Sequence, residues 1–299
     1  MSALDTTAMA PGAGASLPRQ SLWTKAFYKF RRDRLGVASL AVVLGFAVMG
    51  LGAALGWWAT DWSDLKGGYY DPMSSQYWFG TNVNGQDIFA RTVYSTRTAF
   101  EVGLIVALVS TLLGAVLGGL AGFFPGTWID EIILWIKGVL DSIPFYLFVA
   151  AVAYAMQGSA YGMHVALIAT FWTTTARLVR GEVIKLRKFE FVEAARSIGV
   201  PELTILFRHI LPNTFHILLV QATIVFVSAI KSEVILSFLG LGVKDGVSWG
   251  LMISAAAQEV MAGHFNNFIW ASTFMFVLVM AFNAFSDSLQ DALDPKKVA

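Results

Sequence analysis

Residues 35–58 read LGVASLAVVLGFAVMGLGAALGWW, an apolar run that carries no charged side chain. A helix needs about 20 predominantly apolar residues to cross a bilayer, and this run is long enough. Its closing tryptophan pair is typical of a membrane–water interface. A secretory signal peptide has a shorter apolar core followed by a small-residue cleavage site, so we predict that 35–58 is a retained first transmembrane helix.

The composition of the whole chain agrees with this reading. Apolar residues make up 56% of the 299 positions and charged residues only 14%, whereas soluble domains carry about 25% charge. The net charge of +1 is too small for a nucleic-acid-binding surface, so nucleic acid is excluded as a partner. With no cysteine, and with His164, His209, His216 and His264 scattered along the chain, we predict no disulfide and no metal site.

Five further apolar segments predict an all-α integral membrane protein with about six transmembrane helices. They are 99–124, 129–156, 161 to about 178, 214 to about 238, and 268 to about 285. With a cytoplasmic amino terminus, 15 of the 21 Lys and Arg residues lie on the cytoplasmic side, whereas the outer loops hold only Lys66, Arg91, Arg97 and Lys244. This bias follows the positive-inside rule and predicts that both termini are cytoplasmic.

Several segments outside the spans have distinct compositions. Residues 1–20 have the composition of a disordered cytoplasmic tail. We divide the rest into a basic amphipathic cytoplasmic segment 21–34, an outer (periplasmic) loop 59–97, a membrane core 98–290 and a cytoplasmic tail 291–299. A charged cytoplasmic loop, 180–212, interrupts the core.

This loop is predicted to form two short helices that meet at an angle. Residues 190–198 favour a helix, Gly199 suits a left-handed helix end, and Pro201 can begin the next helix but not continue the first. After the break, apolar residues recur at helical spacing, which predicts a face for docking on the bundle or on a partner. They are Leu203, Leu206, Phe207 and Ile210.

The loop resembles a known family. Glu193-Ala194-Ala195, followed by Gly199 and then by Leu211-Pro212, is similar to the loop signature of permeases in bacterial ATP-binding-cassette importers. His209 stands where the general signature has Ile, and the run FRHILPN at 207–213 resembles the dipeptide, oligopeptide and nickel branch.

Other motifs extend this resemblance over nearly the whole chain after residue 20. They are Trp78-Phe79-Gly80-Thr81 with Gly85 and Asp87, where Gln86 replaces a usual Arg, then Ala121-Gly122-Phe123 with Asp130, Ser237 to Gly242 with Ser248-Trp249-Gly250, and Asp291 to Pro295. The pattern is similar to the shorter of the two permeases that pair in such importers.

The resemblance implies a type I importer permease fold, inner-membrane localisation and a set of partners. These partners are a second permease, two ATP-binding subunits that hold ATP and Mg, and an extracytoplasmic substrate-binding protein. It implies that Glu193 anchors the loop to an ATPase and that Ala194 and Ala195 permit close approach. Gly199 is then expected to set the angle between the two helices. The coupling segment is completed by His209, Leu211 and Pro212. The cargo it implies is a di- or oligopeptide, with nickel or another small solute as the alternative.

The chain itself shows no sign of an enzyme or of a cofactor site. No Gly-Lys dipeptide occurs, so the phosphate-binding loop of an ATPase is absent, and we expect ATP hydrolysis in partner subunits only. A membrane-embedded enzyme is disfavoured, since no convergent nucleophile or metal set is recognisable. An ion-coupled secondary transporter is the other alternative, but neither a set of intramembrane carboxylates nor an internal repeat is evident.

Charges within the predicted spans are further candidates, because a charge near the bilayer centre is tolerated mainly where it is paired or faces protein or water. Lys137 and Asp141 lie four apart and are predicted to pair, with a structural or gating role favoured over substrate contact. Lys231 and Glu233 are candidates for the pore or gate; Lys231 either faces a cavity and meets a peptide carboxylate or reaches the interface. Gly114, Gly118 and Gly122 predict a close helix-packing face.

Overall fold

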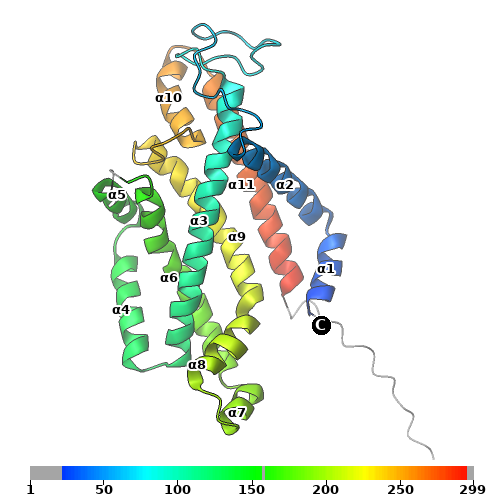
Figure 1. Ribbon diagram of the computed structural model, residues 1–299, viewed down its shortest axis with the longest axis vertical. Helices are drawn as coiled ribbons and strands as arrows, with labels where there is room; N and C mark the ends of the chain where they lie inside the picture. Colours follow the sequence, from blue (N-terminus) through cyan, green and yellow to red (C-terminus); the bar gives the residue numbers. More distant parts are fainter. Residues whose placement is uncertain (1–21, 157–158, 295–299) are drawn as a thin grey trace, which may run out of the picture.

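The computed structural model describes residues 22–156 and 159–294, which form a helical bundle around one long central helix (Figure 1). The predicted tail 1–20 and the last five residues lie outside the described residues. In chain order the α-helices are α1 Leu22–Arg32, α2 Arg34–Ala54, α3 Ile88–Phe123, α4 Trp128–Ser142, α5 Phe145–Ala155, α6 Gly162–Leu186, α7 Glu190–Ser197, α8 Glu202–Thr204, α9 Phe215–Phe238, α10 Trp249–Met261 and α11 Asn266–Leu293. Among the described residues the only β-pairing is an isolated bridge between Thr81 and Asp87.

The lengths and hydropathy of these helices agree with a membrane protein. Within the described part of the chain, α2, α3, the continuous helix Glu202–Phe238 and α11 are each long and apolar enough to cross a bilayer, and α4 with α5 makes a fifth candidate. The predicted span 161–178 corresponds to α6, a 25-residue helix that packs along α3. The all-α prediction is confirmed.

The glycine stripe of α3 explains its close contact with α6. A Cβ atom at Gly114 would lie 2.7 Å from the Trp172 carbonyl oxygen, and one at Gly122 would lie 2.6 Å from that of Arg180. At Gly118 a Cβ would overlap the Ala176 carbonyl oxygen. The predicted packing face is therefore confirmed, since only glycine lets the two helix backbones approach this closely.

The third predicted span, 129–156, is wrong as a single straight helix. It consists of α4 and α5, which meet at an angle of 95°. Ile143 is extended, with φ −92° and ψ 133°, because the ring of Pro144 disfavours the helical region for the residue before it. Pro144 then precedes the first turn of α5.

Two predicted boundaries differ, and one helix is additional. The loop predicted to run from 59 to 97 ends earlier, since α3 begins at Ile88, where the Asp87 side chain accepts a 2.8 Å hydrogen bond from the Phe89 N–H. At its carboxyl end α11 continues to Leu293, into the predicted tail. After Phe238 the chain forms the additional helix α10, whose first turn is capped by the Ser248 hydroxyl.

Candidate functional site

The loop singled out by the sequence forms a compact knob, residues 187–214, at one end of the bundle (Figure 1). Its first helix, α7, ends in a left-handed glycine, Gly199, with φ +80°. The Gly199 N–H donates to the Arg196 carbonyl at 2.9 Å, and the Val200 N–H donates to the Ala195 carbonyl at 3.1 Å. This pair of bonds is a Schellman motif, which satisfies carbonyl groups that a helix end otherwise leaves unpaired. The helix end predicted at Gly199 is therefore present.

The underside of the knob is fixed to the bundle by its own apolar cluster. From the knob, this cluster contains Val192, Ala195, Ile205, Leu206 and Ile210, and from the ends of α3 and α6 it contains Phe123, Val179 and Val183. All eight are buried. An ion pair between Arg196 and Glu202, 3.0 Å, connects the two sides of the Gly199 turn. The knob therefore packs directly on the ends of α3 and α6.

The outer surface of the knob combines apolar and charged side chains. Glu193 and Ala194 on α7 are exposed, whereas Ala195 beside them is buried against the cluster. Ile198 is 81% exposed and Leu203 53% exposed, on either side of the Gly199 turn. Of the apolar face predicted after the break, Leu206 and Ile210 bind the bundle, while Leu203 and Phe207 remain available to a partner.

The second predicted short helix is not a separate element. From Glu202 the chain runs as one continuous helix through Phe238, so α8 is the N-terminal extension of α9. The stretch Ile205–Ile210, which includes His209, is a π-helix, and Leu211–Thr214 is a 3-10 helix. Pro212 explains the irregularity, because it has no N–H to donate to the preceding turn. His209 is half-buried and Pro212 is exposed.

The two intramembrane charges on α4 lie together. The Lys137 ammonium and the Asp141 carboxylate are 2.5 Å apart, and the Lys137 side chain is 16% exposed. Asp141 also lines a groove of about 450 Å³ beside the break between α4 and α5, which we call the break groove. It is lined by residues 140–145 of α4 and α5 and by Thr170, Phe171, Thr173 and Thr174 of α6.

Lys231 lines a second groove, of about 470 Å³, which we call the lysine groove. Phe145 and Phe171 belong to both grooves, so the two adjoin. The remaining lining residues are Tyr146, Ser228, Ser232, Val234, Ile235 and Met275. Lys231 is exposed and has no ion-pair partner among the described residues.

Glu233 lies elsewhere, although it is only two residues from Lys231. Its side chain is 1% exposed and accepts a hydrogen bond of 2.5 Å from the Ser237 hydroxyl. Ser248, which caps α10, is 3.3 Å from the Ser237 hydroxyl. Gly242 and Gly250 pack so closely here that a Cβ on either would overlap α9. The motif from Ser237 to Gly250 thus holds α10 against the C-terminal end of α9, around the buried Glu233 carboxylate.

The outer loop motif also has a structural explanation. Gly80 and Gly85 have positive φ angles of 77° and 74°, and a Cβ on either would overlap a neighbouring carbonyl group. Gln86 accepts a 2.6 Å hydrogen bond from Arg91. The sequence did not indicate the buried Glu259 of α10, which accepts from the Val83 N–H at 3.0 Å and so binds α10 to this loop.

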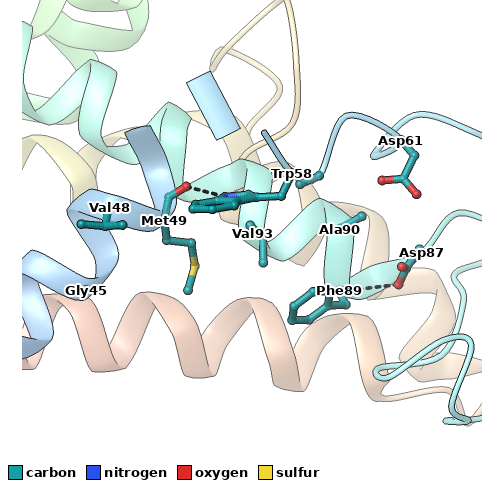
Figure 2. A pocket seen from close by; sticks show the side chains of 10 residues that line it. Gly45, Val48, Met49, Trp58, Asp61, Asp87, Phe89, Ala90 and Val93 are labelled. Atoms are coloured by element: carbon teal, nitrogen blue, oxygen red, sulfur yellow. Dashed lines mark hydrogen bonds between the residues drawn. The ribbon is translucent and has the colours of Figure 1, made fainter. Parts of the chain in front are cut away.

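A cavity of about 510 Å³ lies where this loop meets α2 and α3 (Figure 2). Its walls are apolar, and the Trp58 indole N–H donates to the Met49 carbonyl at 2.9 Å. Asp61 and Asp87 lie at its polar end. Burial raises the pKa of the Asp87 carboxyl, whereas the hydrogen bond to Asp61 raises that of the Lys66 ammonium. Among the described residues, no three His, Asp or Glu side chains lie close enough to hold a metal ion.

Comparison with known proteins agrees with this architecture. Residues 110–298 match the family model described as "binding-protein-dependent transport system inner membrane component". The chain is 35% identical to the dipeptide transport system permease protein DppC of Bacillus subtilis over 284 residues, 93% of this chain and 87% of the relative. It is 34% identical to the oligopeptide permease OppC of the same organism, over 92% of this chain and 90% of the relative.

A glutathione transport system permease protein, GsiD of Pectobacterium atrosepticum, is 36% identical over 92% of this chain and 91% of the relative. The family match covers more than half of the chain, and these relatives are aligned over nearly all of it. The chain therefore belongs to the family of binding-protein-dependent transport system inner membrane components and is a multi-pass permease.

Proposed function

We propose that this chain is one of two permease subunits of an ATP-binding-cassette importer for di- and oligopeptides. The observation that carries the proposal is the knob: an exposed α7 fixed to α3, α6 and α9, on a chain similar to peptide permeases. Its partners are then a second permease, two ATP-binding subunits that contain ATP and Mg, and an extracytoplasmic binding protein. Both termini and the knob lie in the cytoplasm.

Coupling follows from how the knob is built. Glu193 and Ala194 face outward, so α7 can enter a groove on an ATPase with a charged anchor and little steric bulk. Ile198 and Leu203 add exposed apolar area around the turn. Closure of the ATPase dimer then moves α7, and the cluster beneath it transmits the movement to the spanning helices.

We further propose that the surface formed by the break groove and the lysine groove lines the translocation path. A broken helix exposes polar backbone groups, and these are not tolerated against lipid. An ammonium group at membrane depth needs water or a partner for the same reason. Lys231 beside Phe145, Tyr146 and Phe171 provides one cation and an aromatic wall, which is complementary to a peptide with a carboxylate terminus and an apolar side chain.

The assembled transporter in proteoliposomes tests the coupling proposal. Glu193→Arg should leave assembly and basal ATP hydrolysis in place while abolishing peptide uptake stimulated by the binding protein. Glu131→Arg is the matched control, because Glu131 is an exposed glutamate in the first turn of α4, away from α7. Wild-type uptake by Glu193→Arg, or uptake by this chain alone driven by an ion gradient, would contradict the proposal.

A further inference from the structure

The helix that precedes the first span has two distinct faces. Ala26, Phe27 and Phe30 recur at helical spacing along α1, and basic residues occupy the other side. No acidic residue occurs within α1. The chain then breaks at Asp33 and enters the bilayer as α2. An amphipathic helix with aromatic and basic faces at this position is suited to the membrane–water interface.

Packing against α11 uses only part of the apolar face. Ala26 is 5% exposed and packs with Ala292 and Leu293, and the edge of the Phe30 ring contacts the Phe285 ring at 5.9 Å between centroids. Phe27 remains 63% exposed. An almost wholly apolar groove of about 280 Å³ remains between the two helices, lined by Ala26, Phe27, Phe30, Phe285, Leu289, Ala292 and Leu293.

Some of the charged side chains around this groove have partners and others do not. Lys29 donates to the Asp291 carbonyl oxygen at 2.6 Å. Asp33, the acid at the junction, caps α2, and a hydrogen bond from Ser288 lowers the pKa of its carboxyl. Arg31, Arg32 and Arg34 are exposed and have no hydrogen-bond or ion-pair partner among the described residues. Three guanidinium groups are thus left at the point where the chain enters the bilayer.

We propose that α1 and the end of α11 form a binding site for an anionic phospholipid. Guanidinium groups match phosphate geometry with paired N–H donors, so Arg31, Arg32 and Arg34 bind the headgroup. One acyl chain lies in the apolar groove beside Phe27. Charge complementarity favours a lipid over a protein partner, because the groove adjoins a spanning helix at the depth where anionic headgroups lie. The site is independent of the proposed coupling role.

A single-cysteine label tests this site, since the natural chain has no cysteine. Val37 is exposed in the first turn of α2, next to the arginines, so a bimane on Val37→Cys reports the lipid bound there. The assembled transporter is placed in phosphatidylcholine nanodiscs containing one-fifth brominated lipid, either phosphatidylglycerol or phosphatidylcholine. We expect several-fold stronger quenching by the brominated phosphatidylglycerol, and loss of that preference in Arg31→Gln/Arg32→Gln.

Two controls keep the result interpretable. Lys185→Gln/Lys188→Gln removes two cations at the C-terminal end of α6 and should retain the preference for the anionic lipid. In the protein that keeps all three arginines, high salt should reduce the preference for brominated phosphatidylglycerol. Salt screens exposed charges, and it does so without any change of sequence that could affect folding. Equal quenching by the two lipids, or a preference that survives both the arginine variant and high salt, would overturn the proposal. Absence of quenching by either lipid would show that a protein subunit covers the site and would overturn it too.

Discussion

The Asp130 carboxylate and the Arg180 guanidinium form a two-pronged ion pair, with Nε to Oδ1 and Nη2 to Oδ2 both at 2.8 Å. The carboxylate also accepts the Gly126 N–H at 3.0 Å. This interaction fixes the first turn of α4 to the C-terminal half of α6, beside the point where Gly122 packs against Arg180. It stabilises the support on which the knob rests.

Asp130→Asn should destabilise the protein by about 3 kcal/mol, the lower end of the cost of breaking a buried ion pair, because the Arg180 side chain left without its partner is still 28% exposed. The thermal unfolding midpoint in detergent measures this loss. Arg180→Asp should lower the unfolding midpoint further, because it places a second carboxylate beside Asp130. The exchanged pair Asp130→Arg/Arg180→Asp should recover part of the loss, and no recovery would show that the two side chains act separately.

Gly118→Ala should lower the unfolding midpoint, because the new Cβ overlaps the Ala176 carbonyl and forces α3 from α6. We expect a cost of about 1–3 kcal/mol. Gly138→Ala is the matched control: nothing lies within 4 Å of a Cβ there, and alanine favours a helix. Equal midpoints for the two variants would contradict the packing role of the stripe.

Gly199→Val should impair coupling because a β-branched residue is strained at φ +80°. The space around the position is open, so the strain is conformational rather than steric crowding by neighbours. Gly199→Asn should therefore retain most uptake, since Asn tolerates the left-handed region. The measurement is the ratio of peptide uptake to ATP hydrolysed. Equal loss in both variants would mean that the turn needs glycine for another reason.

Neutralising either member of the Lys137–Asp141 pair should reduce uptake more than neutralising both. Lys137→Met leaves a carboxylate without its partner, and Asp141→Asn leaves an ammonium, each costly at membrane depth. The double variant removes both charges. Initial uptake rates at equal amounts of assembled transporter compare the three. If the double variant is no better than the singles, the two residues do not act as a pair.

Lys231→Met should selectively slow the uptake of peptides with a free carboxyl terminus, by tenfold or more if the contact is a charge-assisted hydrogen bond. The same peptides with amidated termini should be transported equally by wild type and variant, provided that the binding protein accepts them. Lys231→Arg, which keeps the positive charge, should retain most of the uptake rate for peptides with a free carboxyl terminus. An equal reduction for free and amidated peptides would indicate that Lys231 supports folding or assembly instead.

Periodicity and hydropathy predicted most of the spans because each is a long apolar run with clear ends. The break in 129–156 was missed because the stretches on both sides of Ser142-Ile143-Pro144 are mostly apolar, and the two charges before it, Lys137 and Asp141, could be explained as a pair within one helix. The effect of Pro144 on Ile143 was the available signal. The early start of α3 had no hydropathy signal, since its first turns bury Thr92, Ser95, Thr96 and Thr98.

The knob was predictable in outline but not in its connection to the bundle. Gly199 marked the end of α7 correctly because the left-handed conformation is a local property. The merging of α8 into α9 is different, since it depends on tertiary packing: the π-helix that joins them, Ile205–Ile210, buries Ile205, Leu206 and Ile210 against α3 and α6. Likewise, Lys231 and Glu233 are two residues apart on a helix, so the sequence predicts that their side chains point in different directions. Which of the two is buried depends on the packing of α10, which the sequence does not show.

The unbroken helix Glu202–Phe238 is ~55 Å long at 1.5 Å per residue. In the proposed importer this helix transmits movement along its whole length: it begins beside the Gly199 turn, Lys231 lies near its other end, and the contact between Ser237 and Ser248 joins α10 to that end. The irregular part of this helix is the π and 3-10 stretch between Ile205 and Thr214. We expect a displacement of the Gly199 end to reach the lysine groove and α10 together, with bending concentrated in that irregular stretch.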